Sequence, residues 1–363
     1  MEKIVITGGE PLSGNITIGG SKNAILPIMA ACILTDEAVH LTNVPNLQDI
    51  QTMIKVLESL GVKADISNLS QNKLTVCYED INKNIAEYDL VRKMRASVLI
   101  LGPLLARKKE ASVSLPGGCA IGARPIDMHI DALKKLGAEF VLDSGYVNCK
   151  APKGLKGNKI DLKKISVGAS ENIIMAASLA SGESEINNIA IEPEVIDLIK
   201  CLKSMGSEID FIGDRKILIQ GKENLRGTTH EVIPDRIEAG TYMIAGALIG
   251  NNLKIQNIEP DHMQNILNVF EELKIDFKLN KDSISISKSD IEVGVNLQTE
   301  EYPGFPTDLQ AQIMVLLSKS KKNSSIIENI FENRFMHVPE LNRMGTQISI
   351  EGNKSIISPS IEL

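Results

Sequence analysis

The chain has 363 residues, of which 43% are apolar and 23% charged, and its formal net charge at pH 7 is −7. This composition is typical of a soluble globular protein and excludes a disordered chain, and the length suggests about two domains. The acidic balance argues against a general nucleic-acid binder, which usually presents a basic face. No apolar run reaches the ~18 residues that span a bilayer. Residues 1–14 lack the long apolar segment of a signal peptide, so we expect a cytoplasmic protein.

The five cysteines form no pattern that predicts disulfides or a metal site. Their number is odd, their spacing is wide and no C-x-x-C pair occurs. Trp is absent and aromatic residues make up 3% of the chain, so aliphatic residues and Met have to build the core. Four cysteines lie in helix or strand patterns and are expected in that core: Cys32, Cys77, Cys149 and Cys201.

A template that recurs at intervals of roughly 70 residues is the most informative feature. In its first copy, apolar residues at i, i+3, i+4, i+7 and i+10 from Ile50 predict one face of a helix. Gly61 then stands where a glycine commonly ends a helix, and VKADI follows as a short strand. The helix of the template recurs with starts at Ile126, Val195, Met263 and Arg334, and only the fourth copy lacks the closing glycine.

Each copy also contains an earlier helix rich in Ala and aliphatic residues, such as NAILPIMAACIL in the first copy and DLQAQIMVLL in the fifth. A short strand joins the two helices, as in AVHLTNV, and further strands follow, as in KLTVCY. The unit reads α-β-α-β-β, and several units packed together would bury their helices in a shared core. Simple α/β alternation is the alternative, but the repeated spacing and the closing glycines favour true repeats. Five copies do not divide into groups of three.

A glycine-rich loop around Cys119 is the sharpest local motif, with the sequence LPGGCAIGARP at residues 115–125. Its three glycines give the backbone unusual freedom, and we expect the thiol to be accessible. Arg124 is close enough in sequence to favour the thiolate. The motif alone leaves open that Cys119 is an incidental loop cysteine.

Two further motifs place chemically useful side chains at helix starts. In GGSKNA, residues 19–24, backbone N–H groups, the helix dipole and Lys22 could converge on an anion, although the Walker A pattern is not satisfied. In FPTDL, Asp308 begins the first helix of the fifth copy after a proline turn. An ordinary surface lysine and an ordinary helix-start carboxylate are the respective alternatives, and for Asp308 the sequence alone favours that alternative over a general base.

Arginines at the edges of the repeats could clamp phosphate or carboxylate groups by paired hydrogen bonds, and ordinary solvated arginines are the alternative. They are Arg95, Arg124 and Arg334, the last two at the start of a second helix. His129 and His337 occupy one template position and are interpreted as satisfied core or helix-edge residues. No metal-binding histidine spacing such as H-E-x-x-H appears.

Taken together, these motifs resemble those of the enolpyruvyl transferases. The resemblance is closer to the branch with a UDP-sugar acceptor than to 5-enolpyruvylshikimate-3-phosphate synthase, which lacks the cysteine loop. The similar segments run in family order from residue 15 to 345: GGSKNAILP, VRKMRAS, SLPGGCAIGARPIDMH, SVGASENI, EPEVIDL, IPDRIEAGTY, YPGFPTDLQAQ and ENRFMHVPELNRMG.

The resemblance implies an α/β (α+β) fold of two inside-out α/β barrel domains made of repeated βαβαββ units. It assigns residues 21–229 to a three-repeat domain with the cysteine loop, and residues 1–20 plus 230–363 to a second domain with two of three repeats. The active site would lie in the cleft between them. The family's sixth repeat, with a D-L-R-A-S motif, has no counterpart here. The chain is therefore either a transferase or a non-catalytic remnant that binds UDP-sugar.

The implied reaction moves the enolpyruvyl group of phosphoenolpyruvate to the 3′-hydroxyl of UDP-N-acetylglucosamine and releases phosphate, as the first committed step of peptidoglycan synthesis. It needs a proton donor for the alkene carbon, a base for the sugar hydroxyl and cationic clamps for the anionic groups. By motif, Cys119 would be the donor and the target of fosfomycin, and Asp308 the base. Lys22 and Arg124 would hold phosphoenolpyruvate, with Asn23 beside them.

The resemblance also implies the residues around the sugar nucleotide, with Arg334 supporting the closed cleft. The two substrates are the expected partners, and we expect no nucleic acid, no membrane, no metal and no organic cofactor. The implied contacts to UDP-N-acetylglucosamine are Arg95, Pro125, Ile126, Asp127, Met128, Lys164, Ile165, Ser166, Val167 and Ile330.

Overall fold

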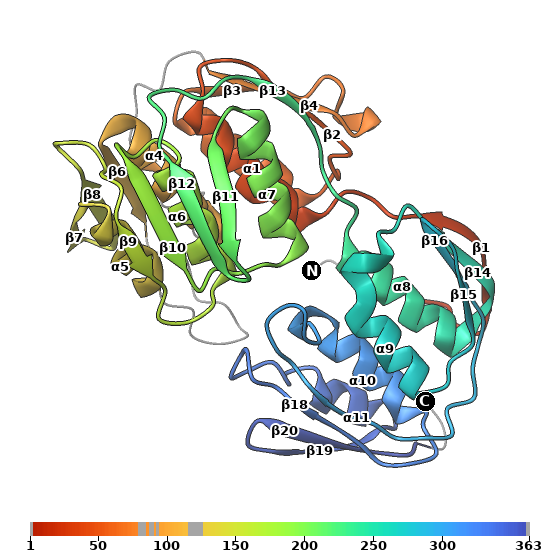
Figure 1. The fold of residues 1–363 in the computed structure, drawn as a ribbon. Helices are drawn as coiled ribbons and strands as arrows, with labels where there is room; N and C mark the ends of the chain where they lie inside the picture. Colours follow the sequence, from red (N-terminus) through yellow and green to blue (C-terminus); the bar gives the residue numbers. More distant parts are fainter. Residues whose placement is uncertain (1–2, 79–84, 87–90, 92–93, 115–125, 361–363) are drawn as a thin grey trace. The chain divides into compact units, whose positions relative to one another are not determined.

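The computed structural model describes residues 3–78, 85–86, 91, 94–114 and 126–360 (Figure 1). The chain forms two compact units. One is continuous, Gly19–Pro234, and the other combines Met1–Ile18 with Asp235–Leu363. From the sequence, the divisions were expected after residues 20 and 229.

The unit Gly19–Pro234 contains the first three copies of the repeat. The first copy comprises α1 (Lys22–Ala31), η1 (Cys32–Leu34), β2 (Val39–Thr42), α2 (Gln48–Ser59), β3 (Val62–Asp65), η2 (Leu69–Gln71) and β4 (Leu74–Tyr78). The second comprises β5 (Ile85–Ala86), η3 (Arg95–Ile100), α4 (Leu101–Lys108), β6 (Glu110–Ser114), α5 (Asp127–Lys135), β7 (Glu139–Asp143) and β8 (Tyr146–Lys150). The third comprises β9 (Lys159–Asp161), α6 (Val167–Ala177), β10 (Glu183–Asn187), α7 (Pro193–Ser204), β11 (Glu208–Gly213) and β12 (Lys216–Gln220), and β13 (Thr228–Glu231) follows.

The other unit contains the last two copies and the first strand of the chain, β1 (Leu12–Thr17). The fourth copy comprises α8 (Arg236–Ile249), β14 (Gly250–Gln256), η4 (Pro260–Met263), α9 (Gln264–Glu272), β15 (Phe277–Leu279) and β16 (Ser283–Ile286). The fifth comprises β17 (Asn296–Gln298), η5 (Thr307–Leu309), α10 (Gln310–Ser318), β18 (Ser324–Ile327), α11 (Val338–Arg343), β19 (Gln347–Glu351) and β20 (Lys354–Ser358).

Every copy builds a four-stranded sheet with the same strand order, which confirms the repeats predicted from the sequence. One parallel pair forms an edge of each sheet, and the remaining pairs are antiparallel. The sheets are β13-β2-β4-β3, β5-β6-β8-β7 and β9-β10-β12-β11 in one unit, and β1-β14-β16-β15 and β17-β18-β20-β19 in the other.

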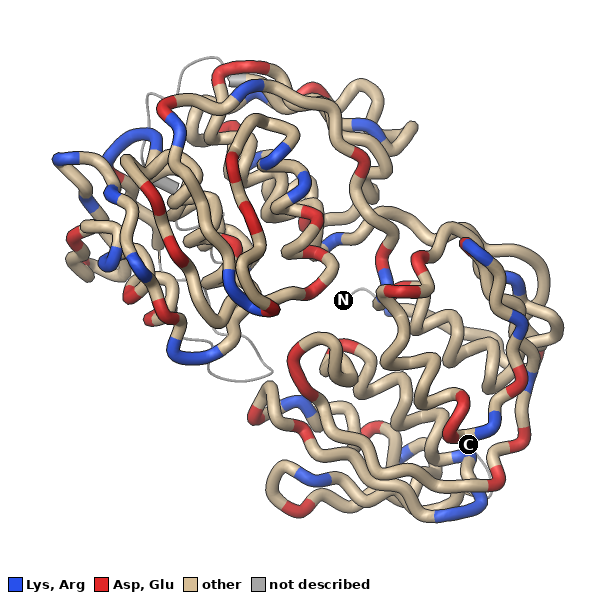
Figure 2. Tube along the Cα trace, viewed as in Figure 1, with Lys and Arg blue, Asp and Glu red and all other residues tan. Residues whose placement is uncertain are grey.

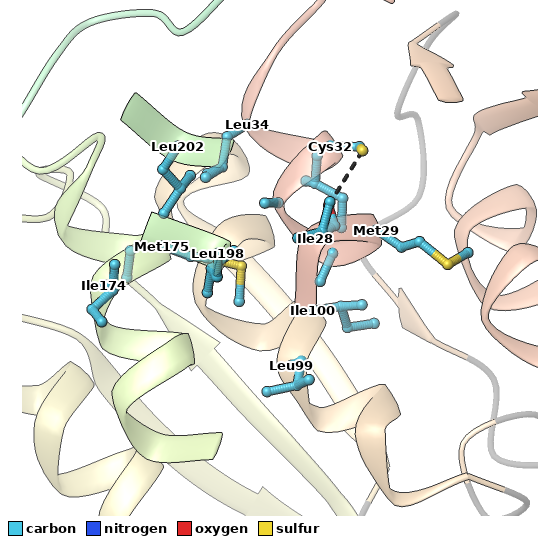
Figure 3. Close-up of a cluster of buried hydrophobic side chains, with 14 of the residues drawn as sticks. Ile28, Met29, Cys32, Leu34, Leu99, Ile100, Ile174, Met175, Leu198 and Leu202 are labelled. Carbon is cyan, nitrogen blue, oxygen red and sulfur yellow. Dashed lines mark hydrogen bonds between the residues drawn. The ribbon is translucent and has the colours of Figure 1, made fainter. Parts of the chain in front are cut away.

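Within each unit the helices lie on the inner side of the sheets, as predicted for helices that share a core (Figure 1). The first helix of a copy is buried on nearly all sides: eight of the ten residues of α1 and nine of the eleven residues of α6 are buried. Figure 3 shows side chains of α1, α6 and α7 meeting those of η3 in the core of the unit Gly19–Pro234. Charged residues are spread over strands, turns and helices such as α7, whereas α10 carries none (Figure 2).

Two sheets take their parallel edge strand from a distant part of the sequence. β1 pairs with β14, and β13 pairs with β2, so the chain passes from one unit to the other and back. An asparagine with positive φ follows the neighbouring strand in three sheets, and its Nδ2 donates to the carbonyl just beyond the edge strand. These bonds are Asn43 to Val232 at 2.8 Å, Asn188 to Leu162 at 2.9 Å and Asn257 to Ile18 at 2.7 Å.

The fifth copy departs from the sequence prediction in its second helix. We expected this helix to start at Arg334, but residues 332–337 form turns and α11 starts at Val338. Pro339 explains the difference, because it has no N–H to donate to the carbonyl of Phe335 and its ring would clash with that carbonyl in a continuous helix. Arg334 therefore projects from a turn.

The described part of the chain contains no helix with the length and apolarity needed to cross a membrane.

The glycines expected after the second helices adopt positive φ, between 94° and 106°, at Gly61, Gly137, Gly206 and Gly345. In the fourth copy, Lys274 adopts this left-handed conformation instead, with φ 58°. A residue with a Cβ atom is disfavoured there by roughly 1–2 kcal/mol.

We therefore predict that Lys274→Gly stabilises its unit. Lys274 is exposed, so its side chain contributes little packing. Relief of the strain, less the freedom that glycine adds to the unfolded chain, should raise the free energy of unfolding by about 1 kcal/mol and Tm by about 2–4 °C. Gly137→Ala is the matched control and should lower the free energy of unfolding. No atom lies within 4 Å of the added Cβ, so only the backbone strain changes. A Tm that stays the same or falls in Lys274→Gly contradicts this account.

Candidate functional site

Lys22 and Asn23 begin α1, as the sequence predicts. Ser21 caps this helix, and its Oγ accepts from the backbone N–H of Ala24 at 3.3 Å. The Nζ atom of Lys22 lies 3.7 Å from Oδ2 of Asp49, and both side chains are about two-fifths exposed. An exposed ion pair of this length is weak, so an incoming anion can compete for the ammonium group.

The other candidate residues of this unit also gather at helix starts. Arg95 is the first residue of η3, and Ile126 immediately precedes α5, whose first turn contains Asp127 and Met128. Ser166 caps α6 through a hydrogen bond from the N–H of Ala169 to Oγ. Lys164 and Ile165 precede this cap and Val167 follows it. Cys119, Arg124 and Pro125 lie outside the described residues.

The side chain of Asn172, on α6, forms hydrogen bonds to three neighbouring helices. Its Oδ1 accepts from the N–H of Gly102 at 2.7 Å, and its Nδ2 donates to the carbonyl of Val98 at 3.0 Å and to Nδ1 of His129 at 2.8 Å. Asn172 is fully buried, and its partners belong to η3, α4 and α5. Asn172 carries no recognisable signal in the sequence, because its partners are 43 to 74 residues away along the chain.

His129 is a neutral histidine in this network. Burial, followed by the positive charge of Arg95, lowers its pKa to about 4. Since Nδ1 accepts from Asn172, Nε2 carries the proton. A Cβ atom on Gly168, in the first turn of α6, would lie 3.1 Å from the His129 ring. His129 thus packs directly against the start of α6, which confirms its interpretation as a satisfied core residue.

Three carboxyl groups belong to α6 and to the start of α7: Glu171, Glu192 and Glu194. All three are buried. Burial, and then the charges of Glu194 and Glu192, raise the pKa of Glu171 well above its ordinary value. Both effects favour the neutral carboxylic acid form of Glu171 over the carboxylate.

In the other unit, Asp308 and Arg334 form an ion pair. Nη2 of Arg334 donates to Oδ1 of Asp308 at 2.7 Å, and the guanidinium carbon lies 5.6 Å from the centroid of the Phe331 ring. Among the described residues, the second carboxylate oxygen of Asp308, Oδ2, has no hydrogen-bond partner. Ile330 lies in the segment between β18 and Arg334. Roles for all three residues follow from the sequence motifs, but the ion pair does not.

Three of the four cysteines expected in the core, Cys32, Cys149 and Cys201, are buried, and Cys77 is partly exposed. Burial raises the pKa of the Cys149 and Cys201 thiols to about 12, so neither is a thiolate at neutral pH. Within the described residues, no group of three or more His, Cys, Asp and Glu side chains could hold a metal ion.

The buried His129 predicts a loss of stability in mild acid. Its folded-state pKa of about 4 lies below the ordinary value of 6.5. The unfolded chain therefore binds a proton that the folded chain does not, and stability falls as the pH drops from 6.5 toward 4. The contribution of His129 should amount to about 3 kcal/mol.

The measurement is denaturant unfolding at several pH values, comparing the wild type with His129→Gln. Carboxylates titrate in both proteins, so the difference between the two pH slopes isolates His129. Parallel slopes for the two proteins between pH 6.5 and 4 would contradict a neutral buried histidine.

Asn172→Leu should destabilise the unit Gly19–Pro234 by about 3 kcal/mol, because it leaves the buried groups of Gly102, Val98 and His129 without their partner. Urea unfolding measures this loss. Asn158→Leu is the control: this exposed side chain also donates to a backbone carbonyl, that of Lys135, and its replacement should cost less than about 1 kcal/mol. Equal losses of stability in the two variants would contradict the role of Asn172 in holding η3, α4 and α5 against α6.

Comparisons with known proteins identify the family. A family model described as EPSP synthase (3-phosphoshikimate 1-carboxyvinyltransferase) matches residues 6–363. UDP-N-acetylglucosamine 1-carboxyvinyltransferase from Koribacter versatilis is 49% identical over 359 residues, which cover 98% of this chain and 82% of that protein. The protein of the same name from Pelagibacter ubique is 49% identical over 362 residues, which cover 100% of this chain and 86% of that protein.

Solved structures share the fold. The enolpyruvyl transferase NikO from Streptomyces tendae matches with a TM-score of 0.89 at 21% identity, over 97% of this chain and 83% of that chain. EPSP synthase from Acinetobacter baumannii matches with a TM-score of 0.71 at 16% identity and the same coverage. The chain therefore belongs to the enolpyruvyl transferases, within the group of the UDP-N-acetylglucosamine 1-carboxyvinyltransferases.

Proposed function

We propose that this chain transfers the enolpyruvyl group of phosphoenolpyruvate to the 3′-hydroxyl of UDP-N-acetylglucosamine and releases phosphate, a step of peptidoglycan synthesis. The observation that carries the proposal is the 49% identity, over nearly the whole chain, to relatives that bear the name of this activity. Shikimate 3-phosphate is the less favoured acceptor, since the EPSP synthase structure shares only 16% identity.

The chemistry needs one proton delivered and one removed. The thiol of Cys119 adds a proton to the alkene carbon of phosphoenolpyruvate, which makes the neighbouring carbon electrophilic. The 3′-oxygen of the sugar attacks that carbon while Asp308 takes the hydroxyl proton. The tetrahedral adduct then loses phosphate and a proton from the former alkene carbon, which restores the double bond.

The geometry at Asp308 suits a base. Arg334 binds only Oδ1, and Oδ2 has no partner among the described residues, so one oxygen is available for the proton of the sugar hydroxyl. The hydrogen bond from Arg334 also fixes the orientation of the carboxylate, which a base needs in order to meet its proton at hydrogen-bond distance. The guanidinium also lies over the Phe331 ring in a cation–π contact, which helps to hold it in place.

Lys22 and Arg124, with Asn23 beside them, hold the phosphate and carboxylate of phosphoenolpyruvate in this proposal. Lys22 stands at the start of α1, where the helix dipole also favours an anion. The starts of η3, α5 and α6, together with Ile330, supply the contacts to the sugar nucleotide. Pro125 completes this set by its place in the motif.

The test is phosphate release from phosphoenolpyruvate with UDP-N-acetylglucosamine, with shikimate 3-phosphate as the control acceptor. We expect turnover with the nucleotide sugar only, and inactivation by fosfomycin. Asp308→Asn keeps the size and one acceptor oxygen but cannot take a proton, so kcat should fall by about 10²–10⁴-fold.

Asn158→Leu, at an exposed position of the unit Gly19–Pro234 to which the proposal assigns no role, serves as the activity control. Turnover with shikimate 3-phosphate, or full activity of Asp308→Asn, would overturn the assignment. Tight binding of the nucleotide sugar without any phosphate release would instead indicate a binding protein.

A further inference from the structure

We infer that Glu328 is a positioning residue that holds the segment of Asp308 and the segment of Ile330 and Arg334 in one hydrogen-bonded arrangement. This inference rests on the proposed function, in which Asp308 is the base and Ile330 contacts the nucleotide. Glu328 follows β18 and did not stand out in the sequence. Its role comes from its contacts.

The carboxylate of Glu328 accepts four hydrogen bonds from three segments of the chain. Oε2 accepts from the hydroxyl of Thr307 at 2.9 Å. Oε1 accepts from the N–H groups of Ile330 at 2.9 Å and Phe331 at 3.1 Å, and from the hydroxyl of Thr299 at 2.8 Å. Each oxygen therefore faces a different part of the candidate site.

Glu328 is only 4% exposed, and no lysine or arginine of the described residues pairs with it. A buried carboxylate is costly unless its oxygens are well hydrogen-bonded. Here two hydroxyls and two backbone N–H groups supply that compensation, and hydrogen bonds to a charged acceptor are roughly twice as strong as neutral ones. The four donors are thus held more firmly than a neutral side chain could hold them.

These bonds close a ring through the candidate site. Thr307 precedes Asp308 in η5 and donates to Glu328. From Glu328 the chain continues through Ile330 to Arg334, which returns to Asp308 through the ion pair. A displacement of either segment therefore strains the contacts of the other.

Thr299 attaches this ring to the sheet. It is fully buried, its N–H donates to the carbonyl of Ile327 at 2.9 Å, and its hydroxyl accepts from the N–H of Asn329 at 3.0 Å while donating to Glu328. Thr299 directly follows β17, and Ile327 ends β18. The carboxylate is thereby fixed to the rigid part of the unit.

The kinetic test uses variants that break one bond at a time. Thr307→Val removes the hydroxyl on the Asp308 side and should lower kcat at least about tenfold, since small misplacements of reacting groups are costly, while KM for the nucleotide sugar changes less. Thr307→Ser keeps a hydroxyl and should restore most of kcat. Glu328→Ala removes the hydrogen bonds to the Asp308 segment and to the Ile330 segment, so kcat should fall and KM should rise. Glu328→Gln keeps an acceptor oxygen at Oε1, so its kcat and KM should lie between those of the wild type and of Glu328→Ala.

Thr346→Val is the matched control, because Thr346 is a buried threonine of the same unit whose hydroxyl donates to Asn342 and not to Glu328. It should lower Tm about as much as Thr307→Val does but leave kcat and KM unchanged. A purely structural role for Glu328 predicts that Thr307→Val behaves in the same way as this control, and that result would overturn the inference.

Amide hydrogen exchange provides a readout that does not need activity. Glu328→Ala should speed exchange at Ile330 and Phe331, whose N–H groups lose their acceptor, and in the peptide around Thr307, with little change elsewhere in the unit. Unchanged exchange in these segments would refute the positioning role. If the wild type releases no phosphate, the proposed function fails, and the exchange experiment still decides whether Glu328 holds the two segments.

Discussion

The parallel strand pair at the edge of each sheet is the interaction on which the whole architecture depends. In three sheets an asparagine side chain closes the end of the pair. In two sheets the edge strand comes from a distant part of the sequence, β1 for β14 and β13 for β2. Neither of these sheets is complete until distant parts of the chain have met.

This architecture also explains where the candidate functional residues lie. Helices buried on nearly all sides leave only their ends near solvent, so polar and charged side chains collect at helix starts, as with Lys22, Arg95 and Ser166. Such ends offer free N–H groups and a favourable dipole for anions. The substrates of the proposed reaction are phosphates and carboxylates, which fits these positions. Buried polar residues behind the helix starts, Asn172 in one unit and Glu328 in the other, keep the positions fixed.

The sequence predicted features that depend on local patterns and missed those that depend on distant partners. Helical spacing revealed all five repeats, and closing glycines supported four of them, because both signals depend only on residues close together in the sequence. The start of α11 was misplaced, since the template ignored Pro339. Asn172 and Glu328 carry no local signal, as their partners lie up to 74 and 29 residues away. The roles of Cys119 and Asp308 came from resemblance and stay predictions.

The bridge between Gly20 and Pro234 has a consequence for how the gene can be rearranged. It brings the two ends of the segment Gly19–Pro234 to neighbouring strand positions, about 5 Å apart. That segment forms three complete sheets from one continuous stretch of chain, like a domain inserted into the other unit. The stretch of the gene that codes for Gly19–Pro234 is therefore suited to expression on its own. In the remaining unit, a linker of only a few residues could join Ile18 to Asp235.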